Sequence, residues 1–189
     1  EDVVQYMFKH QQELLKAFGR EPDDLAKVKI PFERLDYEKA LARVNDLSGT
    51  EKMKYGDDFG ADEEALLTKS ETKPLFVHNF PKDIKAFYMR EDPKKPGTVL
   101  NNDLLAPAGH GEIIGGSERI WELDELTSRM KEQKLDTKDY QWYVDLRRFG
   151  SVPHSGYGLG VERLVKWILN LDHIRDAIPF PRTINRCYP

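Results

Sequence analysis

The spacing of hydrophobic residues predicts a helical N-terminal part. Apolar side chains recur every three or four residues from the start of the chain, which predicts one amphipathic helix that ends at Gly19. Asp36 is a favourable N-cap for a second helix. A polar, glycine-containing loop is expected over 48–60, followed by a short helix over 62–69. Residues 1–72 are therefore expected to be mostly helical.

The pattern changes in the second part of the chain. Segments rich in Val, Ile, Leu, Phe and Tyr occur at 75–80, 86–91, 98–106 and 111–120. Because the turns between them are too short for crossover helices, we expect these segments to pair as antiparallel strands. Helical periodicity returns over 123–134, 137–149 and 161–171. This order predicts an α+β fold, an antiparallel β-sheet flanked by helices, rather than a doubly wound parallel sheet.

Composition narrows the class of protein. The 189 residues are 39% hydrophobic and 33% charged, which is typical of a folded, water-soluble domain. The formal net charge of −4 gives no overall attraction for nucleic acid, so any RNA contact must be local or lie outside these residues. A single cysteine excludes an internal disulfide, the histidines lack metal-ligand spacing, and no apolar run is long enough to span a membrane. We therefore expect a cytoplasmic protein.

The segment PHSGYGLGVERL (153–164) places three glycines at alternate positions directly before a helix. Glycines allow a ligand to approach the backbone closely, and the N–H groups at a helix start favour an anion. Arg163 would add a planar, charged donor suited to phosphate or to a base. The spacing matches neither the dinucleotide fingerprint nor a P-loop. Two interpretations stay open: a nucleotide site, or a glycine-rich strand packed under a helix with Arg163 in a salt bridge.

A second segment, GHGEIIGGSERI (109–120), carries Glu112 and Arg119 on one expected strand. Their separation is odd, so an unbroken strand would direct them to opposite faces, whereas a bulge at Gly115–Gly116 would restore both to one face. The alternative is an ordinary surface ion pair. Asp103 could join Glu112 in holding Mg²⁺ through carboxylate oxygens, or could serve only the turn beside it.

Three segments together resemble a known family. GEIIGGSERI, PHSGYGLGVERL and IRDAIPFPR, in this order, resemble the class II aminoacyl-tRNA synthetases of the aspartate/asparagine subgroup, and the glycine-rich segment is similar to motif 3 of that class. The segments IKAFYMRE (84–91), PHSGYGLG and IPFPR are more similar to asparaginyl- than to aspartyl-tRNA synthetases. The resemblance implies one partial catalytic domain over 1–189: a helical part, 1–72, after the position of motif 2, and antiparallel strands with the motif 3 helix over 73–189.

The resemblance also implies an activity. ATP and asparagine would react to asparaginyl-adenylate, and the amino acid would pass to the terminal ribose of tRNA(Asn), with positioning and charge neutralisation as the catalytic devices. The implied site residues are Arg163 and Glu112 as catalytic and ATP-binding residues; Gly158, Gly160 and Glu162 beside them for ATP; Glu112 and Asp103 for Mg²⁺; and Arg119, Gly115, Ser117 and Gly158 for the amino acid.

The chain departs from the family in what it lacks. Motifs 1 and 2 and the anticodon-binding barrel are absent, and the first predicted helix begins at residue 1 without an initiator Met. We therefore expect a C-terminal part of a catalytic domain that is inactive alone, from a parent that forms a homodimer. Three alternatives to an asparagine–tRNA ligase remain: a tRNA-independent, AMP-forming asparagine synthetase, a non-catalytic synthetase-like regulatory or partner-binding protein, and an aspartate–tRNA ligase.

Overall fold

The centre of the molecule is one five-stranded sheet with the strand order β1-β2-β3-β4-β5. The computed structural model describes residues 1–188. The strands are β1 (Glu33–Asp36), β2 (Leu75–His78), β3 (Asn101–Ala106), β4 (Gly111–Glu118) and β5 (Ser155–Leu159). Strands β1 and β2 are parallel, and every other neighbouring pair is antiparallel. The expected α+β fold is confirmed, with a mixed, mostly antiparallel sheet.

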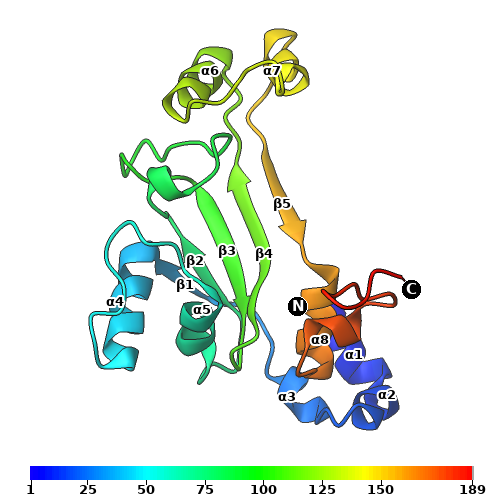
Figure 1. Cartoon of the computed structure of the whole chain (residues 1–189). Coiled ribbons are helices and arrows are strands. Elements are labelled where there is room, and N and C mark those ends of the chain that lie inside the picture. The colour runs from blue at the N-terminus through cyan, green and yellow to red at the C-terminus, as the bar shows by residue number, and fades with distance from the viewer. Residues whose placement is uncertain (189) are drawn as a thin grey trace.

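Helices surround this sheet in three groups (Figure 1). They are α1 (Asp2–His10), α2 (Gln12–Ala17), α3 (Pro22–Ala26), α4 (Tyr37–Ser48), α5 (Ala61–Thr68), α6 (Leu123–Glu132), α7 (Gln141–Arg148) and α8 (Val161–Leu169), with 3₁₀ turns at Lys82–Ile84 and Ile174–Ala177. Helices α1–α3 gather with α8, α4 and α5 lie beside β1 to β4, and α6 and α7 form an upper lobe (Figure 1). No helix within residues 1–188 is long and apolar enough to cross a membrane.

The two faces of the sheet bury different cores, because successive side chains of a strand point to opposite faces. On the face that we call the α8 face, Leu104 and Ala106 pack with Trp167 and Ile168 of α8 and with apolar residues of α1–α3. On the opposite face, called the α5 face, Leu105 of the same strand packs with residues of β2, α4 and α5. The candidate site described below lies on the α5 face.

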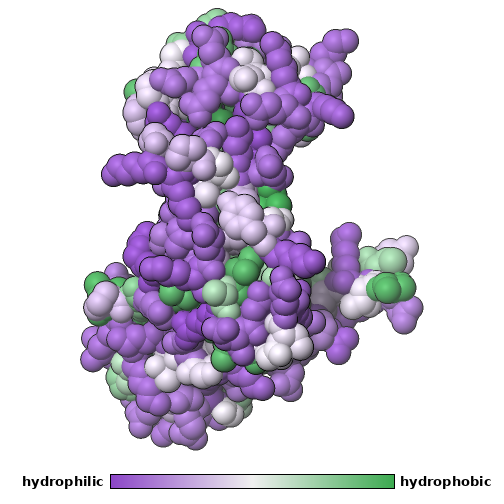
Figure 2. Space-filling model, turned by 90° about the vertical axis from the view of Figure 1, so that its left-hand side faces the viewer, coloured by the Kyte–Doolittle hydropathy of each residue, from purple (hydrophilic) through white to green (hydrophobic). Residues whose placement is uncertain are grey.

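The upper lobe has a core of its own. Phe87 and Ile120 pack there against Leu126, Met130 and Val144 of α6 and α7. Figure 2 shows the molecule narrowing below this lobe, and the face turned toward the viewer is mostly hydrophilic with small hydrophobic patches. The chain enters the lobe at the end of β4 and returns from it at the start of β5, so the lobe holds these neighbouring strand ends together.

Several helix boundaries agree with the sequence predictions. Asp36 caps α4 and accepts a hydrogen bond from the backbone N–H of Glu38 at 3.1 Å. The expected helix ending at Gly19 is instead two helices, α1 and α2, interrupted at Gln11. This break turns α2 so that Leu15 is fully buried in the core of the α8 face, while Gly19 has the expected positive φ of 74°.

The strand predictions need three corrections. Residues 86–91 form no strand. They pair with other segments only at isolated bridges, between Met89 and Arg119 and between Glu91 and Val99. Strands β1 and β5 were not among the four expected strands, because β1 has only four residues and β5 is rich in glycine. The β1–β2 pair is parallel because α4 and α5 between them supply a crossover long enough for parallel strands.

Candidate functional site

The register of β4 with β5 places the alternating glycines on one face. Gly158 lies opposite Gly115, and Gly156 lies opposite Ser117, on the α5 face. Tyr157 and Leu159, which alternate with the glycines, lie opposite Gly116 and Ile114 on the α8 face. The glycine pattern therefore leaves one face without side chains of its own while large side chains occupy the other.

A bulge in β4 brings Glu112 to this same face. Leu104 pairs with Ile114 and Leu105 pairs with Glu112, so Ile113 has no partner of its own. A Cβ atom on Gly115 would lie only 2.5 Å from Oε1 of Glu112. The bulge expected at Gly115–Gly116 thus exists, but at Ile113, because Ile113 is buried in the core of the α8 face whereas both glycines keep their partners on β3.

Arg163, in the first turn of α8, contacts Glu112. Its Nη1 donates to the backbone carbonyl oxygen of Glu112 at 2.7 Å and lies 3.8 Å from the carboxylate Oε2. A Cβ atom on Gly160 would lie 3.2–3.3 Å from the carbon atoms of the Arg163 side chain, so this glycine makes room for the arginine. The strand-and-salt-bridge interpretation of the glycine segment is correct as local structure. The Arg163 side chain is still half exposed, so it remains free to bind a ligand.

Asp103 on β3 has a cationic partner that sequence reasoning missed. Lys85 donates from Nζ to Oδ2 of Asp103 at 3.1 Å and to Oδ1 of Asp58 at 3.2 Å, and it lies 3.9 Å from the centroid of the Phe80 ring. Burial alone would lower the pKa of Lys85, but the two carboxylates outweigh it and raise the pKa above its ordinary value. Lys85 therefore stays an ammonium ion beside Asp103.

Glu112 and Asp103 form a donor pair that suits a hard cation. A Cβ atom on Gly115 would lie 3.6 Å from Oδ1 of Asp103 as well as against Glu112, so both carboxylates face this glycine. Burial, and then the charge of Asp103, raise the pKa of Glu112. Within residues 1–188, no three acidic, histidine or cysteine side chains could enclose a metal ion by themselves. Mg²⁺ commonly takes one or two carboxylates and completes its shell with phosphate and water oxygens, and this pair fits that arrangement.

Arg119 is held on the α5 face by three different segments. Its Nη1 donates to the hydroxyl of Ser117 at 2.6 Å, and its central guanidinium carbon lies 4.6 Å from the ring centroid of Tyr88. A Cβ atom on Gly156 would lie 3.0 Å from Nη2 of Arg119. Ser117 is buried, so its hydroxyl serves Arg119. The first glycine of the G-x-G-x-G pattern therefore makes space for an arginine side chain.

The remaining expected residues differ in exposure. A Cβ atom on Gly158 would meet no atom within 4 Å, so this glycine opens onto free space. Glu162 lies in the first turn of α8 and is exposed. Of the three alternating glycines, only the middle one leaves room for an external ligand.

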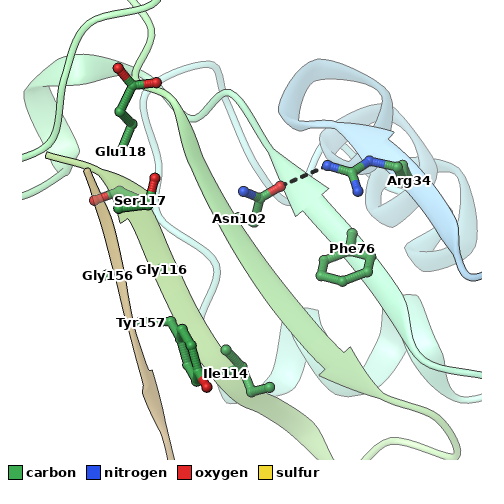
Figure 3. A pocket seen from close by; sticks show the side chains of 10 residues that line it. Arg34, Phe76, Asn102, Ile114, Gly116, Ser117, Glu118, Gly156 and Tyr157 are labelled. Atoms are coloured by element: carbon green, nitrogen blue, oxygen red, sulfur yellow. Dashed lines mark hydrogen bonds between the residues drawn. The ribbon is translucent and has the colours of Figure 1, made fainter. Parts of the chain in front are cut away.

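A separate hollow of about 530 Å³ lies on the α8 face (Figure 3). Phe76, Ile114 and Tyr157 supply its apolar lining, and Arg34 donates to Asn102 at 3.0 Å beside them. No sequence pattern indicates this hollow, because Arg34 reaches it only through the unexpected pairing of β1 with β2. It is on the opposite face of the sheet from the side chains of Glu112 and Arg119.

The chain is similar to proteins of established activity over its whole length. It is 52% identical to the asparagine–tRNA ligase of Thermoplasma acidophilum over 187 residues, which is 99% of this chain and 43% of that protein. It is equally 52% identical to the enzyme of Pyrococcus abyssi, over 100% of this chain and 44% of that protein. The chain thus spans less than half the length of the curated relatives it matches.

Solved structures agree with this similarity. The asparaginyl-tRNA synthetase of Pyrococcus horikoshii, also solved in complex with asparaginyl-adenylate, superimposes with a TM-score of 0.92 at 50% identity. The first of these structures is matched over 98% of this chain and 44% of the synthetase. Residues 1–184 match the family described as tRNA synthetases class II (D, K and N). The chain therefore belongs to the class II tRNA synthetases of the D, K and N group.

Proposed function

We propose that the protein carrying this chain is an asparagine–tRNA ligase, which activates asparagine with ATP to asparaginyl-adenylate and transfers it to tRNA(Asn). The observation that carries the proposal is the shared face: the β4 bulge brings Glu112 to the side of the sheet on which Arg119 is already fixed. The similarity of the whole chain to asparagine–tRNA ligases supports the choice of amino acid. On this proposal residues 1–189 are the C-terminal part of the catalytic domain.

ATP would lie across the open backbone at Gly158, beside the half-exposed guanidinium of Arg163. The side chain of Arg163 then binds phosphate or stacks on the base, while its bond to the Glu112 carbonyl keeps it in place. Glu112 and Asp103 hold Mg²⁺, which when bound neutralises charge on the phosphates of ATP. Gly160 and Glu162 border the same end of the site. The chain supplies no nucleophile, so its residues act by orientation and by fixed charge.

Asparagine would lie at the other end of the same face. The contacts with Ser117 and Tyr88, beside the space at Gly156, orient the guanidinium of Arg119, so it is suited to receive the side-chain oxygen of the amino acid. Gly115 would line the floor between the amino acid and the metal-binding carboxylates. We further propose that the intact enzyme is a cytoplasmic homodimer and that most of its contacts with tRNA lie outside these residues.

The test is amino-acid-dependent ATP–pyrophosphate exchange, measured on the complete gene product that carries this sequence. Asparagine should support exchange and aspartate should not, and charging of tRNA(Asn) should follow. Exchange that prefers aspartate would contradict the proposal, as would asparagine formation from aspartate and ammonia. The 189-residue chain alone should be inactive, because motif 2 is not among its residues. Loss of even one preorganised charge at the reacting phosphate costs about 10²–10³-fold in rate.

A further inference from the structure

The backbone N–H of Glu112 is bound by a side chain far away in the sequence. It donates to Oε2 of Glu64, on helix α5, at 2.9 Å. This contact lies immediately before the β4 bulge, at the one place where pairing with β3 changes register. It is a charge-assisted hydrogen bond, which is stronger than one between neutral groups.

The chain is shaped to allow this contact. A Cβ atom on Gly111 would lie 2.9 Å from Oε2 of Glu64, and Gly111 has a positive φ of 76°. At Gly109 a Cβ atom would meet Ala65, the next residue of α5, at 3.7 Å. Gly109 in the β3–β4 turn and Gly111 at the first position of β4 thus let α5 approach this strand. Burial, which is the largest effect, raises the pKa of Glu64, and the neighbouring charge of Glu112 acts in the same direction.

The two sides of the Glu112 backbone are held by opposite charges. The carboxylate of Glu64 accepts from the N–H, and the guanidinium of Arg163 donates to the carbonyl at 2.7 Å. We propose that Glu64 is a positioning residue that, opposite Arg163, fixes the Glu112 backbone so that its carboxylate stays directed toward Asp103 and Gly115. The inference rests on the proposed role of Glu112 in holding Mg²⁺ with ATP. Glu64 needs no contact with either ligand to act in this way.

Variants of Glu64 distinguish the effect of its side-chain length from the effect of its negative charge. Glu64→Gln keeps an acceptor oxygen at the same distance, so it should retain most of the effect. Glu64→Asp keeps the charge but is one methylene too short to reach the N–H, so it should behave like Glu64→Ala. The matched control is Glu63→Ala on the same helix, because Glu63 instead bonds the N–H of Gly60 at 3.1 Å and Lys52 at 2.8 Å.

Two measurements on the complete gene product test the proposal. Without any ligand, amide hydrogen exchange at Glu112 should become faster in Glu64→Ala and Glu64→Asp but not in Glu63→Ala or Glu64→Gln. In ATP–pyrophosphate exchange, the Mg²⁺ concentration for half-maximal rate should rise about 10-fold or more in the first two variants, as for loss of other groups that orient metal ligands. Thermal unfolding of each variant identifies any that fail to fold, and Glu64→Asp then replaces Glu64→Ala.

The outcomes are distinguishable. Unchanged amide exchange at Glu112 and unchanged Mg²⁺ dependence in Glu64→Asp and Glu64→Ala would overturn the positioning role, even if Glu112→Ala shifts the Mg²⁺ dependence. A defect in Glu64→Gln with none in Glu64→Asp would also overturn it, because Glu64 would then act through charge. If Glu112→Ala itself leaves the Mg²⁺ dependence unchanged, the proposed metal role of Glu112 fails and the inference fails with it.

Discussion

The guanidinium of Arg119 lies over one aromatic ring, with its central carbon 4.6 Å from the ring centroid of Tyr88. Such a contact is worth about 0.5–2 kcal/mol, depending on how far it is removed from water. It also restricts the plane of the guanidinium, which decides where the free N–H groups of Arg119 point. Tyr88 is therefore expected to affect recognition of the amino acid without touching it.

Replacement of Tyr88 by Leu should raise the KM for asparagine by about 3- to 30-fold, as loss of a cation–π contact of this strength would. Tyr88→Phe keeps the ring and should stay close to the wild type. In both variants the KM for ATP should change little. A matched control is Phe76→Leu, since Arg34 lies 5.0 Å from the Phe76 ring on the opposite face. Equal changes in both KM values would contradict the assignment.

Alanine at two of the alternating glycines should produce two separate defects. A Cβ atom on Gly156 would displace Arg119, whereas one on Gly158 would enter open space. Gly156→Ala should therefore weaken asparagine binding, and Gly158→Ala should weaken ATP binding. Neither should lower the melting temperature by more than a few degrees, because the side chain displaced by Gly156→Ala is flexible. Steady-state kinetics with each substrate varied in turn measures the two KM values. If both variants raised the KM for the same substrate, separate roles for the two glycines would be refuted.

The two arginines of the site should also be separable. Arg163→Ala should raise the KM for ATP about 10-fold or more, because it removes a charge-assisted donor, and Arg119→Ala should do the same for asparagine. Arg163→Lys keeps the charge but loses the planar fork and should recover only part of the loss. Exchange kinetics provide the measurement, and wild-type values in either alanine variant would reject the role given to that arginine.

Stability should depend on pH through Glu112. Its pKa is raised in the folded protein, chiefly by burial, so the folded state binds this proton more tightly than the unfolded state. Stability is therefore lost as pH rises from the ordinary carboxyl value of about 4.3 through the raised pKa. Glu112→Gln should melt at a higher temperature than the wild type at pH 7 without Mg²⁺, and the gain should vanish near pH 4. A variant less stable at pH 7 would contradict this sign.

Asp36 should show the opposite dependence. Burial alone would raise its pKa, but hydrogen bonds from Lys95 and from the N–H of Glu38 outweigh it and lower the pKa. Its contribution is thus present above the unfolded value of about 3.9 and is lost as pH falls through the lowered pKa. Asp36→Ala should cost about 0.5–2 kcal/mol at pH 7, the usual range for an N-cap. Asp36→Asn should lower the free energy of unfolding by less, because asparagine can also cap a helix. Urea unfolding measures both values. An equal loss in the two variants would exclude capping as the cause.

The fold could be predicted wherever local chemistry decides it. The cap at Asp36 and the apolar periodicity of α8 depend on neighbouring residues, and both helices begin close to where the sequence indicates. Strands β1 and β5 depend instead on partners: β1 is held by β2, some forty residues later, and β5 by β4. The segment 86–91 has strand composition but meets its neighbours only at single positions.

The candidate site could be predicted in its main residues but not in their supports. Glu112 and Arg119 were candidates from their segment, with an ordinary surface ion pair as the alternative, and only the family resemblance implied their roles; the need for a bulge followed from their odd spacing. The supporting residues Glu64, Lys85 and Tyr88 come from other segments, and only packing brings them close. A signal existed for Lys85 and Tyr88, which both lie in the segment 84–91 that carries part of the family resemblance.

The unpaired Ile113 makes the length of β4 as important as its composition. Deleting this single residue would leave Glu112 opposite Leu105 in a regular ladder, still on the α5 face, but it would remove a buried side chain from the core of the α8 face. Keeping the odd separation in a strand without the bulge would instead turn Glu112 to the α8 side, although every proposed ligand-binding residue would still be present. Anyone transplanting this segment into another sheet must therefore preserve the bulge together with the odd count between Glu112 and Arg119. A motif search that counts residues but ignores the bulge would accept chains whose carboxylate and guanidinium never meet the same substrate.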